Sequence, residues 1–185
     1  MVLLQQNEDG KLWGFEFEAR KNLGFIAPTL PEKMTFMTPV LQRTNFLTNV
    51  TFVQSEVTAL VRPATALTPA SFRTRDLQGQ SPYVVNAAVE YVDYDWGTVR
   101  LLYNTVGPTI TAVQDRTGLP DFIQERRDQL DFVYLTQVTP WNVPLTVKFA
   151  VENILNDSYP TFVGDTLQED YRTGVNVSLG ISYSY

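Results

Sequence analysis

Seven separate stretches of the chain alternate apolar and polar residues with a period of two. In LWGFEFEAR, the side chains of Trp13, Phe15, Phe17 and Ala19 share one face, and the two glutamates lie on the other. This period predicts β-strands with one apolar and one polar face, and no stretch shows convincing helical periodicity. The predicted strands cover residues 12–20, 44–57, 83–91, 98–104, 129–135, 145–153 and 174–185.

The connections between these strands alternate in length. DYDWG (93–97) and TPWNVP (139–144) are short, whereas the links at 62–82, 107–127 and 156–170 are long and rich in Gly, Pro, Asp, Thr and Gln. Short turns at one rim and long loops at the other are typical of an up-and-down antiparallel barrel of the outer-membrane type. The long stretch 22–43 breaks this alternation, because a short turn is expected there.

The composition of the chain limits the catalytic and metal sites that it can form. Cysteine and histidine are both absent, so disulfides, thiolate catalysis, Ser-His triads and the common zinc sites cannot be built from this chain. The net charge of -6 opposes broad binding to nucleic-acid phosphates. The predictions are therefore no catalytic residues, no metal and no cofactor.

The N-terminal residues MVLLQQNEDGKLWG do not have the charge and apolar run of a signal peptide. No stretch approaches the roughly 18 apolar residues of a transmembrane helix. A membrane location stays open, because a barrel strand needs only about 9–11 alternating residues. The mean hydropathy of -0.12 does not decide the question.

The two faces of the predicted strands differ in kind. The polar faces carry charges of both signs, as a water-filled lumen would. Aromatic residues flank the apolar faces, as in the girdles of membrane barrels, with Trp13 and Tyr83 at one boundary and Tyr91, Tyr94, Trp96, Trp141, Tyr183 and Tyr185 near the other. The candidate lumen-facing residues are Glu16, Glu18, Arg20, Asn86, Glu90, Arg100, Asp131, Lys148 and Glu152. The candidate lipid-facing and girdle residues are Trp13, Phe15, Phe17, Tyr83, Tyr91, Tyr103, Phe132, Tyr134, Phe149, Leu179, Ile181, Tyr183 and Tyr185.

Alternatives remain open from the pattern alone. A soluble β-sandwich or a lipocalin-like binding protein would turn the same apolar faces inward. A small self-closing outer-membrane barrel with a structural or adhesive role would need an eighth strand, which MVLLQQN could supply. An enzyme is the weakest alternative: Glu16 and Glu18 lie about 7 Å apart along one strand, as glycosidase carboxylates can, but solvation in a lumen explains them better.

Several phrases, taken together and in order, resemble the late barrel strands of TonB-dependent outer-membrane receptors. They are LWGFEFEARKNLGFI, LQGQSPYVVNAAVEYVDYDWGTVRLLYNTVG, ERRDQLDFVYLTQV, LTVKFAVENILNDSY and the closing VSLGISYSY. The resemblance covers most of the chain from Leu12 to Tyr185. It does not cover Ala27 to Arg43.

The resemblance implies a fold and a location. The fold is all-β, with about seven or eight antiparallel up-and-down transmembrane strands that form a partial barrel. Residues 1–185 would be the C-terminal segment of a receptor barrel, without its plug domain, in the outer membrane of a Gram-negative bacterium. The partners would be outer-membrane lipid, the remaining strands and plug of a longer receptor, and the assembly machinery, which reads a closing strand that ends on an aromatic residue such as Tyr185.

The function that the resemblance implies is energy-coupled uptake of a scarce ligand, such as a metal chelate, a glycan or a peptide, with no covalent step. The long loops could contribute to ligand binding, although their charged residues are better explained as solvated. These loop residues are Arg73, Arg75, Asp115, Arg116, Asp121, Asp165, Glu169 and Asp170.

Overall fold

The main sheet of the computed structural model is antiparallel and runs up and down in chain order, as the alternation predicts. The structure describes residues 7–62, 65–114 and 119–183. The seven long strands, in spatial order, are β1 (Asn7–Asn22), β2 (Thr44–Arg62), β4 (Tyr83–Asp93), β5 (Gly97–Val106), β8 (Arg127–Val138), β9 (Leu145–Glu152) and β12 (Asn176–Tyr183).

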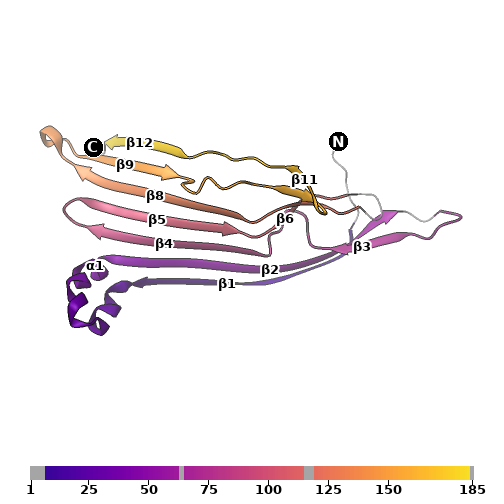
Figure 1. Ribbon diagram of the computed structural model, residues 1–185, viewed down its shortest axis with the longest axis horizontal. Coiled ribbons are helices and arrows are strands. Elements are labelled where there is room, and N and C mark those ends of the chain that lie inside the picture. Colours follow the sequence, from indigo (N-terminus) through magenta and orange to yellow (C-terminus); the bar gives the residue numbers. More distant parts are fainter. Residues whose placement is uncertain (1–6, 63–64, 115–118, 184–185) are drawn as a thin grey trace.

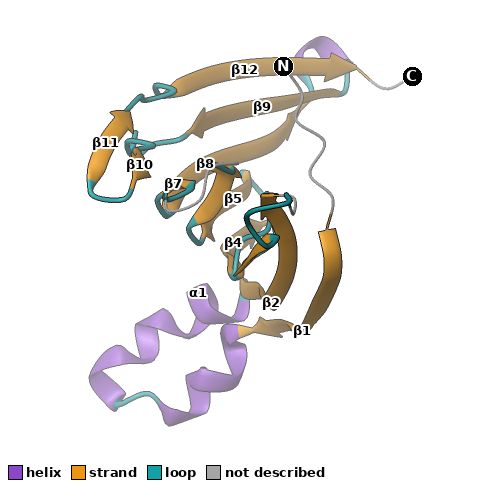
Figure 2. Cartoon of the chain, turned by 90° about the vertical axis from the view of Figure 1, so that its right-hand side faces the viewer, coloured by secondary structure: helices purple, strands orange, loops and turns teal. Residues whose placement is uncertain are grey.

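The sheet is elongated and open. Its short turns and the C-terminus lie at one end, and its long loops lie at the other (Figure 1). Seen along the strands, the sheet is curved, with β1 and β12 as its two edges (Figure 2). Within the described residues these two strands do not pair, so the sheet is not closed. Residues 1–6, which were considered for an eighth strand, lie outside the described residues, and Asn7 already belongs to β1.

The strand register shows which residues of the seven strands share a side of the sheet. One row of paired residues crosses the whole sheet, and its members are Lys21, Phe46, Val89, Leu101, Phe132, Val151 and Val177. Because residues that pair across antiparallel strands point to the same side, the apolar faces of all seven strands merge into one continuous surface.

The long links contain short strands that the sequence pattern does not reveal. β3 (Ser71–Arg75) pairs with the far end of β2. A second sheet has the order β11, β10, β7, β6 and lies at the loop end, with bounds Thr166–Glu169, Thr161–Val163, Phe122–Gln124 and Thr109–Ala112. With three to five residues each, these strands are too short for a clear alternating pattern.

The connection from β1 to β2 is helical, although the sequence shows no convincing helical periodicity there. It contains the 3-10 helices η1 (Leu23–Thr29) and η2 (Glu32–Met37) and the short α1 (Thr38–Gln42). Another 3-10 turn, η3 (Pro140–Asn142), joins β8 to β9. Helices of three to seven residues give no helical period to detect. No helix among the described residues is long and apolar enough to cross a membrane.

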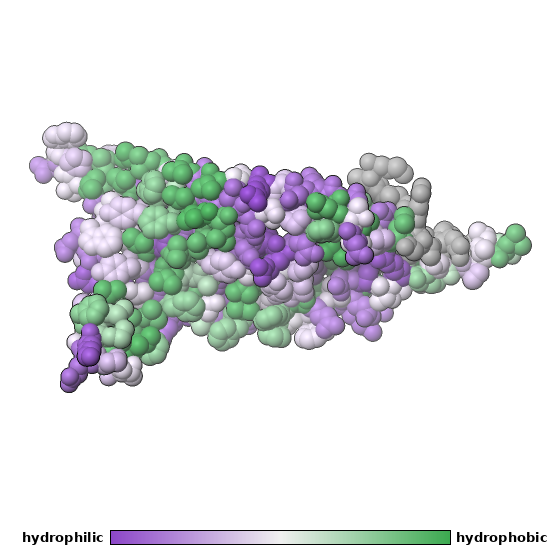
Figure 3. All heavy atoms as spheres, viewed as in Figure 1, coloured by the Kyte–Doolittle hydropathy of each residue, from purple (hydrophilic) through white to green (hydrophobic). Residues whose placement is uncertain are grey.

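Few apolar side chains of the described residues are buried. Among the described residues, the buried apolar ones are Val57, Ala59, Ala150 and Tyr159, and no large side chain is completely buried. Apolar side chains on the edge strands are 55–68% exposed, and apolar residues gather over much of the face seen in Figure 3. The part of the chain that the structure describes therefore has almost no hydrophobic core.

Candidate functional site: the polar face of the main sheet

The polar face carries a row of amide and carboxylate side chains. Glu18, Asn49, Asn86, Asn104 and Gln129 pair in register across β1, β2, β4, β5 and β8. They come from five strands that are far apart in the sequence, and only the register of the sheet places them side by side. Because side chains of paired residues project to one side, the row forms a polar stripe across the sheet.

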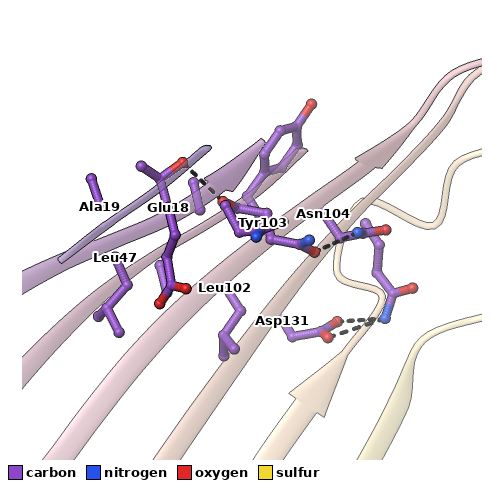
Figure 4. Close-up of a pocket in the computed structure, with 13 residues that line it drawn as sticks. Glu18, Ala19, Leu47, Leu102, Tyr103, Asn104 and Asp131 are labelled. Carbon is purple, nitrogen blue, oxygen red and sulfur yellow. Dashed lines mark hydrogen bonds between the residues drawn. The ribbon is translucent and has the colours of Figure 1, made fainter. Parts of the chain in front are cut away.

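This stripe lines a shallow pocket of about 460 Å³. Asp131 on β8 also lines it, and the apolar Leu47 and Leu102 lie between the polar groups. Figure 4 shows that Leu102 and the neighbouring Tyr103 point to opposite sides of the sheet. Side chains on the polar face of five adjacent strands line this one pocket. The polar face is therefore the hollow side of the curved sheet, and the apolar face is its convex side.

Hydrogen bonds hold the stripe in place. Asn104 Nδ2 donates to Asn86 Oδ1 at 2.7 Å, and Asn49 Nδ2 donates to Glu16 Oε1. The amide of Gln129 donates to both carboxylate oxygens of Asp131, at 3.0 and 3.1 Å. Since cross-strand polar pairs stabilise a register, the stripe supports the order of these strands.

Three further contacts extend the network. The guanidinium of Arg100 pairs with the carboxylate of Glu90, which lies directly opposite on β4 and is 7% exposed. The backbone N–H of Asn153 donates to Asp131 Oδ1 at 2.8 Å, and its side chain donates to Gly174 O at 2.7 Å. The end of β9, the start of β12 and the polar stripe are thus tied together.

The structure places the predicted lumen-facing residues on this one face. Glu18, Asn86 and Asp131 line the pocket, and Glu90 and Arg100 pair beside it. The others lie elsewhere on the same face: Glu16, Arg20, Lys148 and Glu152. Asn49, Asn104 and Gln129 are pocket residues that the candidate set does not include. Their polar character is visible in the sequence, but their convergence depends on the strand register.

The predicted lipid-facing residues share the opposite, convex face. They are Trp13, Phe15, Phe17, Tyr83, Tyr91, Tyr103, Phe132, Tyr134, Phe149, Leu179, Ile181 and Tyr183. Tyr185 lies outside the described residues.

An aromatic cluster marks the end of the convex face at the short turns. The ring of Trp96 lies 5.6 Å from that of Tyr91 and 6.0 Å from that of Tyr134, measured between centroids. The hydroxyl of Tyr134 also donates to the backbone oxygen of Trp96 at 2.5 Å. Trp and Tyr side chains each combine a large apolar ring with an N–H or O–H group that can form hydrogen bonds.

Among the described charged residues of the long loops, Asp121 is buried, contrary to the expectation that these charges are solvated. Asp121 is 4% exposed, accepts from Arg73 Nη1 at 3.1 Å and accepts from the Gln114 N–H at 2.9 Å. It therefore fastens the β3 hairpin to the loop after β6. Asp165, Glu169 and Asp170 are exposed, and Asp115 and Arg116 lie outside the described residues.

The polar side chains that line the pocket can form hydrogen bonds with a bound molecule. Amides both donate and accept hydrogen bonds, and the two carboxylates accept them, so the stripe suits water, hydroxyl groups or backbone amides. Within the described ranges, no group of three or more acidic residues is arranged to hold a metal ion.

Comparisons with known proteins identify no relative. No family model matches the chain, and neither a curated protein nor a solved structure matches it.

Proposed function

We propose that this chain is a wall segment of an outer-membrane β-barrel that belongs to a receptor or transporter of the TonB-dependent kind. The observation that carries the proposal is the exposed, convex apolar face that runs unbroken across seven strands, opposite a hollow polar face. A barrel in lipid has this arrangement, apolar outside and polar inside. A soluble barrel has the reverse.

The stagger of the strands supports a barrel wall. In the row that crosses the sheet, Lys21 lies one residue from the end of β1 at the turn rim, whereas Val151 lies six residues from the turn-rim end of β9. The rim therefore shifts by about one residue per strand. With a rise near 3.3 Å and a strand spacing near 4.8 Å, this shift corresponds to a tilt of about 35°. Transmembrane barrel strands tilt by about 35–45°.

The apolar band has a suitable height. On the convex face of β1, Lys11 and Lys21 bracket the residues from Trp13 to Ala19. These ten residue steps span about 33 Å along the strand, or about 27 Å across a membrane at that tilt. The apolar band of outer-membrane barrels is about 25 Å tall. Lysines at both ends can extend their ammonium groups into the headgroup regions.

The free edges support further barrel strands as partners. Six antiparallel pairings in succession make β1 and β12 run in the same direction. Closing one onto the other would create a parallel pair, and unpaired edges in hydrocarbon cost several kcal/mol per group. An odd number of additional antiparallel strands would close the wall with an even total, and both a longer receptor and an eight-stranded barrel meet this condition.

The receptor class and its uptake function follow from the resemblance of the strand phrases to TonB-dependent receptors. In that proposal the polar stripe faces the plug or the aqueous lumen, and no covalent step is involved. The closing strand would be read by the outer-membrane assembly machinery.

Single cysteines test the membrane wall, because the chain has no native cysteine. Spin labels at Phe149→Cys and Lys148→Cys occupy adjacent positions on opposite faces of β9. In outer-membrane lipid we expect the label at 149 to collide with dissolved oxygen and the label at 148 with a water-soluble nickel complex. Protection of position 149 from both reagents would indicate a soluble core, and nickel access at both positions would also overturn the proposal.

A separate experiment tests the proposal that the chain belongs to a longer receptor. An antibody raised against residues 171–185 would detect the native polypeptide in the outer-membrane fraction of the cells that make it. A band several times heavier than 21.0 kDa supports a receptor. A band at that mass whose migration changes on heating would support the small barrel instead.

A further inference from the structure

The helical connection between β1 and β2 (residues 22–43, the elbow) exposes an unusual amount of apolar surface. Phe25, Met34, Phe36 and Val40 are 59%, 41%, 75% and 45% exposed. The resemblance to TonB-dependent receptors does not cover residues 27–43 of this stretch. Its apolar surface therefore needs an explanation of its own.

The composition of the elbow is unusual for a connection in water. Between Asn22 and Gln42, the charged residues are Glu32 and Lys33 alone. Surface loops are commonly rich in Gly, Asn, Asp and Ser, which satisfy the backbone and contact water. Short amphipathic helices with exposed Phe and Met are instead suited to an interface that is apolar on one side.

The base of the elbow is closed by hydrogen bonds. The side chain of Asn22 donates to Gln42 O at 2.9 Å and to Asn45 Oδ1 at 3.1 Å, and it accepts from the Gly24 N–H at 2.9 Å. The backbone N–H of Val92 donates to Arg43 O at 2.9 Å. Both ends of the elbow are therefore fixed to the sheet, and its orientation relative to the wall is defined.

The elbow begins where the convex apolar face ends. Lys21 lies on that face, and its Nζ is 5.5 Å from the centroid of the Phe25 ring. The elbow lies at the short-turn end of the sheet, the same end as the Trp96 cluster, and Figure 2 shows it projecting beyond β1 and β2. The exposed ring of Phe25 thus extends the convex face at its short-turn end.

We propose that the elbow is a membrane-surface anchor: Phe25, Met34, Phe36 and Val40 enter the boundary between headgroups and acyl chains of the leaflet on the short-turn side. The inference rests on the proposed membrane wall. The occupant is a phospholipid interface, because the apolar surface of the elbow is continuous with the lipid-facing band and its few charges let it approach lipid. A docked protein is the competing occupant.

Spin labels in the cysteine-free chain test this placement. The variant Phe36→Cys reports on the elbow, Glu32→Cys is its matched control on η2, and Phe149→Cys is the reference for the wall. The whole native protein would be studied in nanodiscs of phosphatidylethanolamine and phosphatidylglycerol. We expect the ratio of oxygen to nickel collisions at position 36 to be higher than at position 32 and lower than at position 149.

The outcomes separate the two proposals. If position 149 contacts lipid but positions 36 and 32 both contact water, the anchor is wrong and the wall stands. If position 36 is protected from both reagents, a protein surface covers the elbow and the anchor is also wrong. If positions 149 and 36 both contact water, the wall and the anchor fall together.

Discussion

The guanidinium of Arg43 pairs with the carboxylate of Asp93, and this contact fastens the elbow to the turn between β4 and β5. Asp93 also accepts the backbone N–H of Asp95 at 2.9 Å and of Trp96 at 3.4 Å. One carboxylate thus organises the turn and holds the elbow beside it.

This contact predicts a pH dependence. The hydrogen bond from Asp95 is the main reason that the pKa of Asp93 lies below its ordinary value of 3.8, with Trp96 and Arg43 adding to it and burial opposing it. A carboxyl with a lowered folded pKa stabilises the protein above its unfolded pKa, and the stability is lost as the pH falls through the folded value. We expect the stability difference between wild type and Asp93→Asn to be constant above about pH 5 and to shrink below about pH 4. Urea unfolding across this range measures it.

The control for this titration is Asp95→Asn, which changes an exposed carboxylate in the same turn. Its stability relative to wild type should vary much less in acid. A gap between wild type and Asp93→Asn that stays constant down to about pH 2 would contradict the role of Asp93.

A charge on the convex face should destabilise the membrane form. Phe149 lies in the middle of β9, and its ring packs edge-on against that of Phe132 at 6.5 Å between centroids. We expect Phe149→Arg to lower the free energy of unfolding by about 2–4 kcal/mol in lipid, as for arginine at the midplane of a barrel wall. The neighbouring Lys148→Arg, on the polar face, should change it little. Equal effects of the two substitutions would mean that the faces are misassigned.

The buried carboxylate of Asp121 should contribute more to the stability of the long loops than their exposed carboxylates do. Asp121→Ala removes the acceptor of the Gln114 N–H and the carboxylate that pairs with Arg73, whose Nη1 keeps its bond to Leu119 O at 2.9 Å. We expect a loss of about 1–3 kcal/mol in the local stability of the loops. Faster hydrogen exchange at the Gln114 amide is the readout, and Asp165→Ala is the exposed control. Unchanged exchange in Asp121→Ala would show that the loops hold together without it.

The sequence pattern was sufficient for the long strands and their faces. Residues such as Phe17 and Glu18 alternate strictly, and each strand is long enough for the period of two to be read without its neighbours. The elbow and the short loop strands were not predictable in this way. Their conformation depends on partners distant in sequence, such as the contacts of Asn22 with Gln42 and Asn45.

The candidate site was predictable only as a set of polar positions. That Glu18 and Gln129 share one row follows from four successive strand pairings, and a shift of one residue in any of them would change the face of every later strand. The position of Asp121 was also not predictable from the sequence pattern. Its burial depends on the folding of two loops against each other, which alternation along one strand does not encode.

The turn between β4 and β5 should tolerate no side chain at its glycine. Gly97 has a φ of +120°, and a Cβ there would lie 2.3 Å from Leu135 O and 2.9 Å from Thr136 Cβ. Gly79 is a matched control, because its φ is +80° and no atom lies within 4 Å of its Cβ position. Backbone strain alone costs about 1–3 kcal/mol, so both alanine variants should lose stability and Gly97→Ala should lose clearly more. Because β5 pairs with β8 at Thr98 and Leu135, the added loss should also lower the hydrogen-exchange protection of the Leu135 amide in the folded protein. Urea midpoints that are the same for Gly79→Ala and Gly97→Ala would mean that β5 and β8 are farther apart at this turn than the structure places them.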